Sequence, residues 1–337
     1  MIGAGSLLEA SAQALSGLGS DPDGPARQQT TRDFRRVEEQ LTLHWTPSSQ
    51  LRVSGRLEAR EDASHAQNYY DPGTYAAVPY RGEGHDGAAA LEARWNLAAG
   101  LDAVRGLRRD AGHRDLWRSD THTRERAGEA EATTWRAGLN WVVSPALRLY
   151  AGAGAGFRMP NTTEFTLNAQ AQTQDHKAYA LTPERSRSVQ VGATGLLAGH
   201  WEYRLEAQRT RVEDLLAYTY DTSWAWPPLF TSHYVNAGAI RAQSVEGALG
   251  WRGGGDWAMG VDLVARAQET RDLDHDVDGQ RYGQQNSAIL RHPFFTAGVT
   301  AFTQSARWRF DARLQRVGPR YDLNDTTYGV QAIREPY

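Results

Sequence analysis

The sequence has no cysteine, no long apolar run and no excess of basic charge. Without cysteine the chain has no disulfides, thiolate zinc sites or cysteine nucleophile. Its mean hydropathy is −0.62, and no stretch approaches the roughly 18 apolar residues of a membrane helix. A membrane barrel is still possible, because its strands expose only alternate residues to lipid. The net charge of −3 argues against a nucleic-acid partner, whose binding surface is basic.

Apolar and polar residues alternate with a period of two from residue 37 onward, which is typical of half-buried strands. Short turns and long polar loops alternate between these stretches, as in an up-and-down outer-membrane barrel. Long loops are expected at 64–87, 113–130, 159–184, 220–233 and 271–288. About twelve candidate strands are centred on 37–45, 51–59, 89–97, 101–103, 135–143, 147–157, 189–193, 201–207, 245–251, 257–265, 295–301 and 308–314.

The two faces of these strands differ in character. Seven tryptophans lie within a few residues of a short turn and share the apolar parity of their strand, as expected of an aromatic girdle at a membrane interface. They are Trp45, Trp95, Trp141, Trp201, Trp251, Trp257 and Trp308. The opposite face carries charges of both signs, for example Arg52, Glu92 and Arg136. The pattern therefore predicts an all-β, antiparallel transmembrane barrel with a charged lumen. A soluble structural or adhesive β-protein is the alternative that solubility without detergent would support.

Two sequence motifs at a fixed separation, and a third motif in a later hairpin, resemble those of a known family. The first runs from Gly154 to Phe165, and the second runs from Leu181 to Gly192. The matching positions are Phe157, Arg158, Pro160, Glu164, Leu181, Pro183, Glu184, Ser186 and Gly192, followed later by Asn236, Gly238 and Glu246. Together these motifs resemble the barrel signature of TonB-dependent outer-membrane receptors, and most closely that of vitamin B12 and siderophore receptors. We interpret these residues as barrel architecture rather than ligand contacts.

The resemblance implies a location in the outer membrane of a Gram-negative bacterium, in contact with its lipid. It implies uptake of a large scarce nutrient, cobalamin or a ferric siderophore, which extracellular loops capture and TonB-driven plug movement passes inward. Barrels of this family have 22 strands, whereas no plug, TonB box or final strand is recognisable here. We therefore expect a fragment that forms a curved, incomplete barrel over residues 34–322. Residues 1–33 are expected to be poorly structured, with one weak helix at Leu7–Leu18, and residues 323–337 to form a loop or tail.

Aromatic residues in the predicted outer loops are candidate ligand contacts, although packing of the loops on their neighbours is the alternative. These candidates are Tyr69, Tyr70, Trp224, Trp226, Phe230 and His233. A second hypothesis concerns calcium, the one cofactor that the sequence suggests. Asp272, Asp274, Asp276 and Asp278 precede Gly279 with the alternating carboxylates of a calcium loop. Gln285 stands where such a loop has its bidentate Glu, so a solvated acidic loop is the alternative.

The alternative function is enzymatic, because some small outer-membrane barrels are lipases or proteases. Such an enzyme needs a Ser–His or Asp–His constellation at the outer rim. His65, His122 and His233 fall in outer loops but in no recognisable motif. The ten histidines also show no pair at helical i, i+4 spacing. We therefore expect no catalytic residues and no transition-metal site.

Overall fold

The computed structural model describes residues 11–18, 29–69, 80–118, 123–175, 177–223, 229–273, 292–324 and 329–333. Strands dominate these residues, and one helix interrupts them. In chain order the elements are β1 (Ser11–Leu18), β2 (Gln29–Ser48), β3 (Leu51–Tyr69), β4 (Tyr80–Ala98), β5 (Leu101–Arg118), β6 (Thr123–Ser144), β7 (Leu147–Arg158), α1 (Thr162–Asp175), β8 (Glu184–Leu197), β9 (Trp201–Glu213), β10 (Leu216–Ser223), β11 (Leu229–Asn236), β12 (Ala239–Gly253), β13 (Ala258–Asp272), β14 (Phe295–Gln304), β15 (Arg309–Val317), β16 (Arg320–Asn324) and β17 (Gly329–Ile333).

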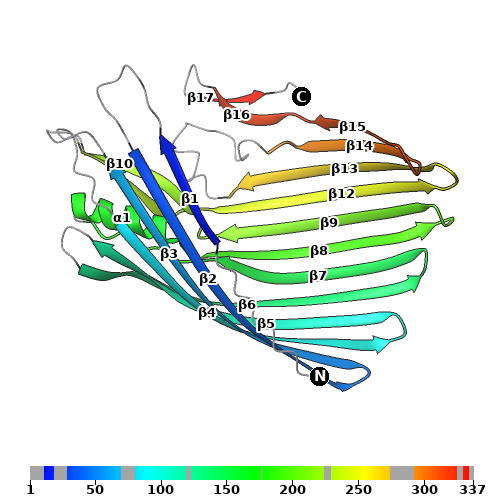
Figure 1. The fold of residues 1–337 in the computed structure, drawn as a ribbon, viewed down its shortest axis with the longest axis horizontal. Helices are drawn as coiled ribbons and strands as arrows, with labels where there is room; N and C mark the ends of the chain where they lie inside the picture. Colours follow the sequence, from blue (N-terminus) through cyan, green and yellow to red (C-terminus); the bar gives the residue numbers. More distant parts are fainter. Residues whose placement is uncertain are drawn as a thin grey trace.

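Thirteen strands form one antiparallel sheet in which sequence neighbours pair, from β1 through β9 and then β12 to β15. The β10–β11 hairpin and the β16–β17 hairpin stand outside this sheet. Figure 1 shows the sheet curling strongly between its two edges. Among the described strands, β1 and β15 each pair on one side only, so the sheet is open. The prediction of a curved, incomplete barrel is confirmed, and every strand predicted from the alternation is present.

The connections separate into two rims (Figure 1). Tight turns join β2 to β3, β4 to β5, β6 to β7 and β8 to β9 at one rim, whereas α1 lies at the other, next to the β10–β11 hairpin. Gly100 shows why one of these turns needs glycine. Its φ is 75°, and a Cβ there would lie 2.7 Å from the carbonyl oxygen of Val142.

Three of the predicted long loops are largely strand. β5 continues to Arg118 and β6 begins at Thr123, so most of the loop expected at 113–130 is paired backbone. Likewise β3 extends to Tyr69 and β4 starts at Tyr80, within the loop expected at 64–87, and the β10–β11 hairpin occupies much of 220–233. These extensions lie beyond the apolar band, where both faces meet polar surroundings. Alternation disappears there although the backbone pairing continues.

The chain ends also differ from expectation. The predicted helix at Leu7–Leu18 is wrong, because Ser11–Leu18 forms β1 and pairs with β2 from Ser11↔Arg36 to Leu18↔Gln29. Pairing with an existing strand satisfies backbone groups, and this outweighs weak helix propensity. At the other end, β17 lies within the expected tail and pairs with β16.

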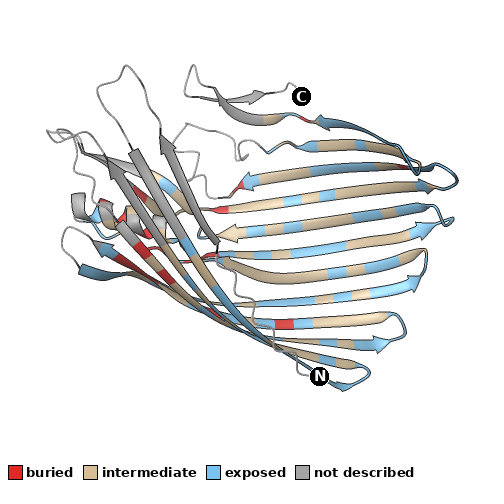
Figure 2. Cartoon of the chain, viewed as in Figure 1, coloured by how far each residue is buried: buried red, intermediate tan, exposed pale blue. Residues whose placement is uncertain are grey.

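The outward face of the sheet is apolar and exposed. Trp45 is 65% exposed, Leu314 is 73% exposed and Leu139 is 52% exposed, and many Leu, Val and Trp side chains of the same parity are similar. Figure 2 shows few buried positions along the strands, with most of them near α1. The small buried core includes Leu116, Phe165 and Leu181 at that end. Among the described residues, no helix is both long and apolar enough to cross a membrane.

Strand geometry locates the apolar band. About eleven residues at about 3.3 Å each, tilted by about 45°, rise about 26 Å, which is close to the height of such a band. Counted from the tight-turn rim, strand residues beyond the eleventh therefore lie outside it. Leu139 lies about five residues from the turn that follows β6, near the middle of the band.

Leu139→Arg is expected to destabilise the membrane-inserted chain by about 2–4 kcal/mol, because it places a charge in hydrocarbon. The neighbouring Asn140→Arg is the matched control, since Asn140 faces the other side and pairs with Asp102 on β5. Denaturant unfolding from lipid vesicles measures both. Equal losses for the two variants would contradict the assignment of the faces.

Candidate functional site

The inward face of β2–β5 carries a ladder of ion pairs that crosses from strand to strand. Arg36 Nε donates to Asp62 Oδ1 at 2.7 Å, linking β2 to β3. Asp86 on β4 accepts from Arg60 Nε at 3.0 Å and from Arg114 Nη1 at 2.7 Å, linking β3, β4 and β5. We call this set the luminal ladder; its members are Arg36, Glu58, Arg60, Asp62, Asp86, Arg108 and Arg114.

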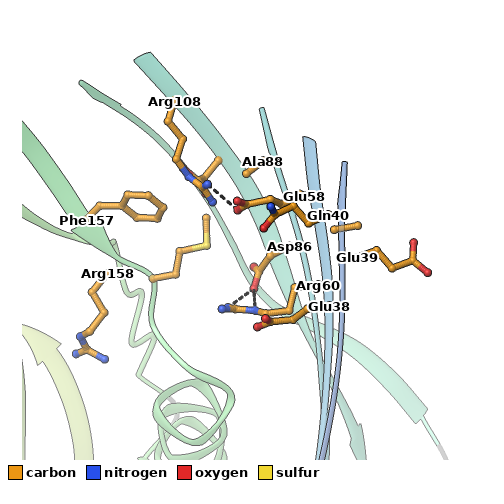
Figure 3. A pocket seen from close by; sticks show the side chains of 14 residues that line it. Glu38, Glu39, Gln40, Glu58, Arg60, Asp86, Ala88, Arg108, Phe157 and Arg158 are labelled. Carbon is orange, nitrogen blue, oxygen red and sulfur yellow. Dashed lines mark hydrogen bonds and ion pairs between the residues drawn. The ribbon is translucent and has the colours of Figure 1, made fainter. Parts of the chain in front are cut away.

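A pocket of about 460 Å³ lies against the luminal ladder, between β2–β5 and the end of β7. Figure 3 shows Arg108 reaching Glu58 and Arg60 reaching Asp86 on one wall, with Arg158 across from them. Arg108 Nη1 lies 2.6 Å from Glu58 Oε2, which spans two strand spacings. Paired charges around a wet cavity can meet a polar partner without leaving an isolated ion, which would be costly. The pocket therefore suits a polar or charged occupant.

Arg158 joins the end of β7 to α1 and to β8. Its Nε and Nη2 donate to the two carboxylate oxygens of Glu184 at 2.8 and 2.9 Å, and its Nη1 donates to Glu164 Oε1 at 2.9 Å. Glu184 also accepts from the backbone N–H of Leu216 at 2.8 Å, which ties in β10. Burial opposes ionisation of Glu184, but the hydrogen bonds from Arg158 and Leu216 outweigh it and lower its pKa. One arginine thus holds three elements together at the outer rim.

The helix that carries Glu164 was not predicted, although its start has a sequence signal. Asn161 Oδ1 accepts from the Glu164 N–H at 3.0 Å, and Glu164 Oε2 accepts from the Asn161 N–H at 2.7 Å. This reciprocal pair is a capping box. Pro160 is fully buried before it, and Phe165 is buried after it. A Cβ at Gly128 on β6 would overlap the Phe165 ring, so the glycine admits α1 against the sheet.

Two asparagines fasten the β10–β11 hairpin. Asn168 on α1 accepts from the Tyr234 N–H at 2.6 Å and donates to the Tyr234 carbonyl at 2.8 Å. Asn236 does the same to Thr182, at 2.7 and 2.8 Å. Each side-chain amide forms hydrogen bonds with both the N–H and the C=O of one residue, as a residue of a neighbouring strand would. Gly238 follows with a φ of 86°, a left-handed turn before β12 that favours glycine.

The family-motif residues therefore lie mainly together at the outer rim, where Pro183 and Leu181 are also buried. Phe157 lines the pocket beside Arg158. Glu246 lies apart on β12, where it stands opposite Glu206 on β9. Arg204 pairs with Glu246, and Tyr150 donates to Glu206 at 2.6 Å. These partners offset the repulsion between the two carboxylates.

The predicted ligand and calcium residues are only partly within the described structure. His233 is buried, and its ring lies 4.0 Å from that of Tyr179, so it packs the hairpin. Asp272 is buried at the end of β13. Tyr69 lies on β3 and Phe230 lies on β11, and only the backbone of these two residues is described. The remaining positions, Tyr70, Trp224, Trp226, Asp274, Asp276 and Asp278, lie outside the described residues altogether.

The fold and its two unlike faces define an outer-membrane β-barrel protein. A model of the TonB-dependent receptor-like β-barrel matches residues 7–336. The chain therefore belongs to this family, and its location is the outer membrane of a Gram-negative bacterium. Members of the family and the similar solved structures are receptors and transporters, not enzymes. No curated protein matches the sequence.

Solved structures support the fold. The ferric citrate transporter FecA matches with a TM-score of 0.71 at 12% identity, over 96% of this chain and 48% of that one. The copper transporter OprC has a TM-score of 0.66 at 15% identity, over 89% and 47%. The ferric yersiniabactin uptake receptor FyuA from Yersinia pestis has a TM-score of 0.61 at 15% identity, over 96% of this chain and 48% of that one. The chain thus spans about half the length of these structures.

Arg158→Met is expected to lower the free energy of unfolding by about 1–3 kcal/mol, because it leaves Glu164 and Glu184 buried without their cation. The loss is below that of a fully buried pair, since the Arg158 side chain is 44% exposed. Urea unfolding in detergent measures it. Adding Glu164→Gln and Glu184→Gln should recover at least half of the loss, and the exposed Arg211→Met should cause no measurable change. No recovery would contradict the role assigned to the charges.

The same pair predicts a pH dependence. Because folding lowers the pKa of Glu184, its ion pair contributes fully above the ordinary glutamate value of about 4.3. That contribution is lost as pH falls through the lower pKa of the folded state. The stability difference between the native chain and Arg158→Met should therefore stay constant above about pH 5 and shrink below about pH 4.

Proposed function

We propose that this chain forms part of the barrel wall of a TonB-dependent importer of a large metal chelate, a ferric siderophore or cobalamin. The observation that carries the proposal is the curved sheet with apolar side chains outside and the luminal ladder inside. A solvated lumen of paired charges can enclose a folded polar plug. TonB would act on that plug, and the wall described here would guide the substrate past it.

An iron chelate is favoured over cobalamin as the substrate. Three of the similar solved structures transport ferric citrate, ferric yersiniabactin or a ferric catecholate, as their names state. Ferric chelates are often anionic, and the arginines of the pocket wall, Arg60, Arg108 and Arg158, suit such a cargo. These arginines also have acidic partners, so the wall would make passing contacts rather than hold the cargo tightly.

The outer-loop aromatics would supply capture. Tyr69 ends β3 and Phe230 belongs to β11, and in the sequence Tyr70 follows β3 and Trp224 and Trp226 follow β10. Flat rings give contact area to a chelate at low entropic cost. His233 is assigned to packing instead, because it is buried and its ring lies against that of Tyr179.

The test is uptake in the native host. Deleting the reading frame should abolish TonB-dependent uptake of one chelate from a panel of radiolabelled ferric citrate, ferric hydroxamates, ferric catecholates and cobalamin. Restoring the gene should restore uptake in a strain with TonB but not in one without it. Trp224→Ala with Trp226→Ala should weaken binding of that chelate by about tenfold, the loss of one to two stacking contacts.

Localisation is the control for that assay, because an absent protein also fails to transport. Membrane fractionation should find the tryptophan variant in the outer membrane at the native level. Unchanged uptake of the entire panel after deletion would contradict the proposed function. Uptake that persists without TonB would contradict it as well.

We also propose that the acidic segment that begins with the last residue of β13 binds calcium through Asp272, Asp274, Asp276 and Asp278. Alternate carboxylates followed by glycine support a chelating turn. Calorimetric titration should show one calcium ion bound with a dissociation constant of about 1 mM or tighter, the range of extracellular sites.

Asp274→Asn with Asp276→Asn should weaken this calcium binding by at least about tenfold, because two of the anionic ligands become neutral. Asp256→Asn, an exposed change at the opposite rim, is the control and should leave the affinity unchanged. Equal effects of the two changes would contradict a specific calcium loop.

A further inference from the structure

Two histidines and an aspartate meet on the outward face of the sheet, apart from the luminal ladder. His85 on β4 and His113 on β5 are direct cross-strand partners, and their ring centroids lie 5.0 Å apart. Asp115 lies two residues further along β5, with its Oδ2 3.6 Å from His113 Nε2. One potential ligand atom from each of the three residues lies within 4.8 Å of the others.

The side of the sheet follows from alternation. His85 has the parity of Leu91 on β4, and His113 has that of Leu107 on β5, and both leucines are exposed on the outward face. The pair lies about twelve residues from the tight turn between β4 and β5, or about 28 Å above it at a 45° tilt. The cluster therefore sits just above the apolar band, at the level of the outer-leaflet headgroups.

The chemistry of the three groups suits a transition metal. Neutral imidazole is a preferred ligand of zinc, copper and nickel, and a carboxylate adds anionic charge. Glu61 Oε1 on β3 lies 3.7 Å from His85 Nδ1, where an outer carboxylate orients a ligating ring and leaves the other nitrogen for the metal. The two imidazoles are about one-third exposed, so an ion can reach them from solvent.

We propose that His85, His113 and Asp115 bind one divalent transition-metal ion of the zinc class on the outward face of β4 and β5. Three protein ligands leave a coordination position for water or for an anionic headgroup group. The bound ion would link two neighbouring strands beyond the membrane. The proposal is independent of the import function, because the site faces away from the lumen.

Asp115 already has two arginine partners, which would compete with a metal ion for its carboxylate oxygens. Arg126 Nε donates to its Oδ1 at 2.7 Å, and Arg124 Nη2 donates to its Oδ2 at 2.8 Å. Metal binding must displace at least one of these guanidinium groups from Asp115. Both arginine side chains are about half exposed, so either can turn into water at little cost. Removing one should therefore favour the metal, by freeing an oxygen and removing a repelling charge.

The experiment titrates the full chain, without an affinity tag and stripped of metal by a chelator, in detergent micelles. Zinc chloride should bind at one equivalent with a dissociation constant on the order of 10 µM or tighter. His85→Ala and His113→Ala should each weaken binding by at least about tenfold, the loss of one of three ligands. His200→Ala, an exposed histidine in a tight turn, is the matched control and should change it by less than about twofold.

The variant Arg126→Gln tests whether Asp115 takes part in metal binding, or whether the two histidines alone bind the ion. It should tighten zinc binding by about threefold, because Asp115 becomes available. Circular dichroism and heat-dependent gel mobility should show that every variant folds as the native chain does. Absence of one-equivalent binding would overturn the proposal. So would equal weakening by His200→Ala, or weaker binding in Arg126→Gln.

Discussion

The structure depends on the fact that successive side chains of a strand meet different media. A backbone in hydrocarbon must satisfy all of its polar groups internally, which the strands between β1 and β15 do by pairing on both sides. Each strand then presents one row of side chains to lipid and one to a wet interior. Leu139 and Asn140 are neighbours in sequence, yet one is exposed on the apolar face and the other stands across from Asp102. Most of the charged side chains at membrane level therefore lie on the concave side, where several pair across strands.

Beyond the apolar band this constraint relaxes, and another source of order takes over. At the outer rim, ion pairs and amide clamps hold elements that the sheet alone would not position. Arg158 connects β7, α1 and β8, and Asn168 fixes β11 to α1. The buried core of the described chain also gathers there. The wall is thus stabilised by backbone pairing in the membrane and by packed side chains above it.

The sequence was sufficient for the fold within the membrane and insufficient above it. Alternation predicts all of the membrane-level strands that the structure describes, because the two media impose it residue by residue. Alternation does not predict the outer parts of β5 and β6. The start of β6, which contains Arg124 and Arg126, has no alternating row of apolar residues. Helix α1 is not predicted despite the Asn161–Glu164 capping box, since most of its residues are polar and show no apolar helical period. The residues of β1 by themselves favour a weak helix, and only the pairing with β2 makes this segment a strand.

The metal-ligating cluster shows why a site can be invisible in sequence and plain in structure. His85 and His113 are separated by a strand, a turn and another strand, and only the pairing register places them opposite each other. A shift of one residue would turn one ring to the lumen and the other to the outside. Helical i, i+4 spacing of histidines has no meaning in a sheet protein. In a barrel, cross-strand partners on one face are the equivalent of helical neighbours. Sites in such folds are therefore set by the lengths of the turns, which fix the register, as much as by the residues that form them.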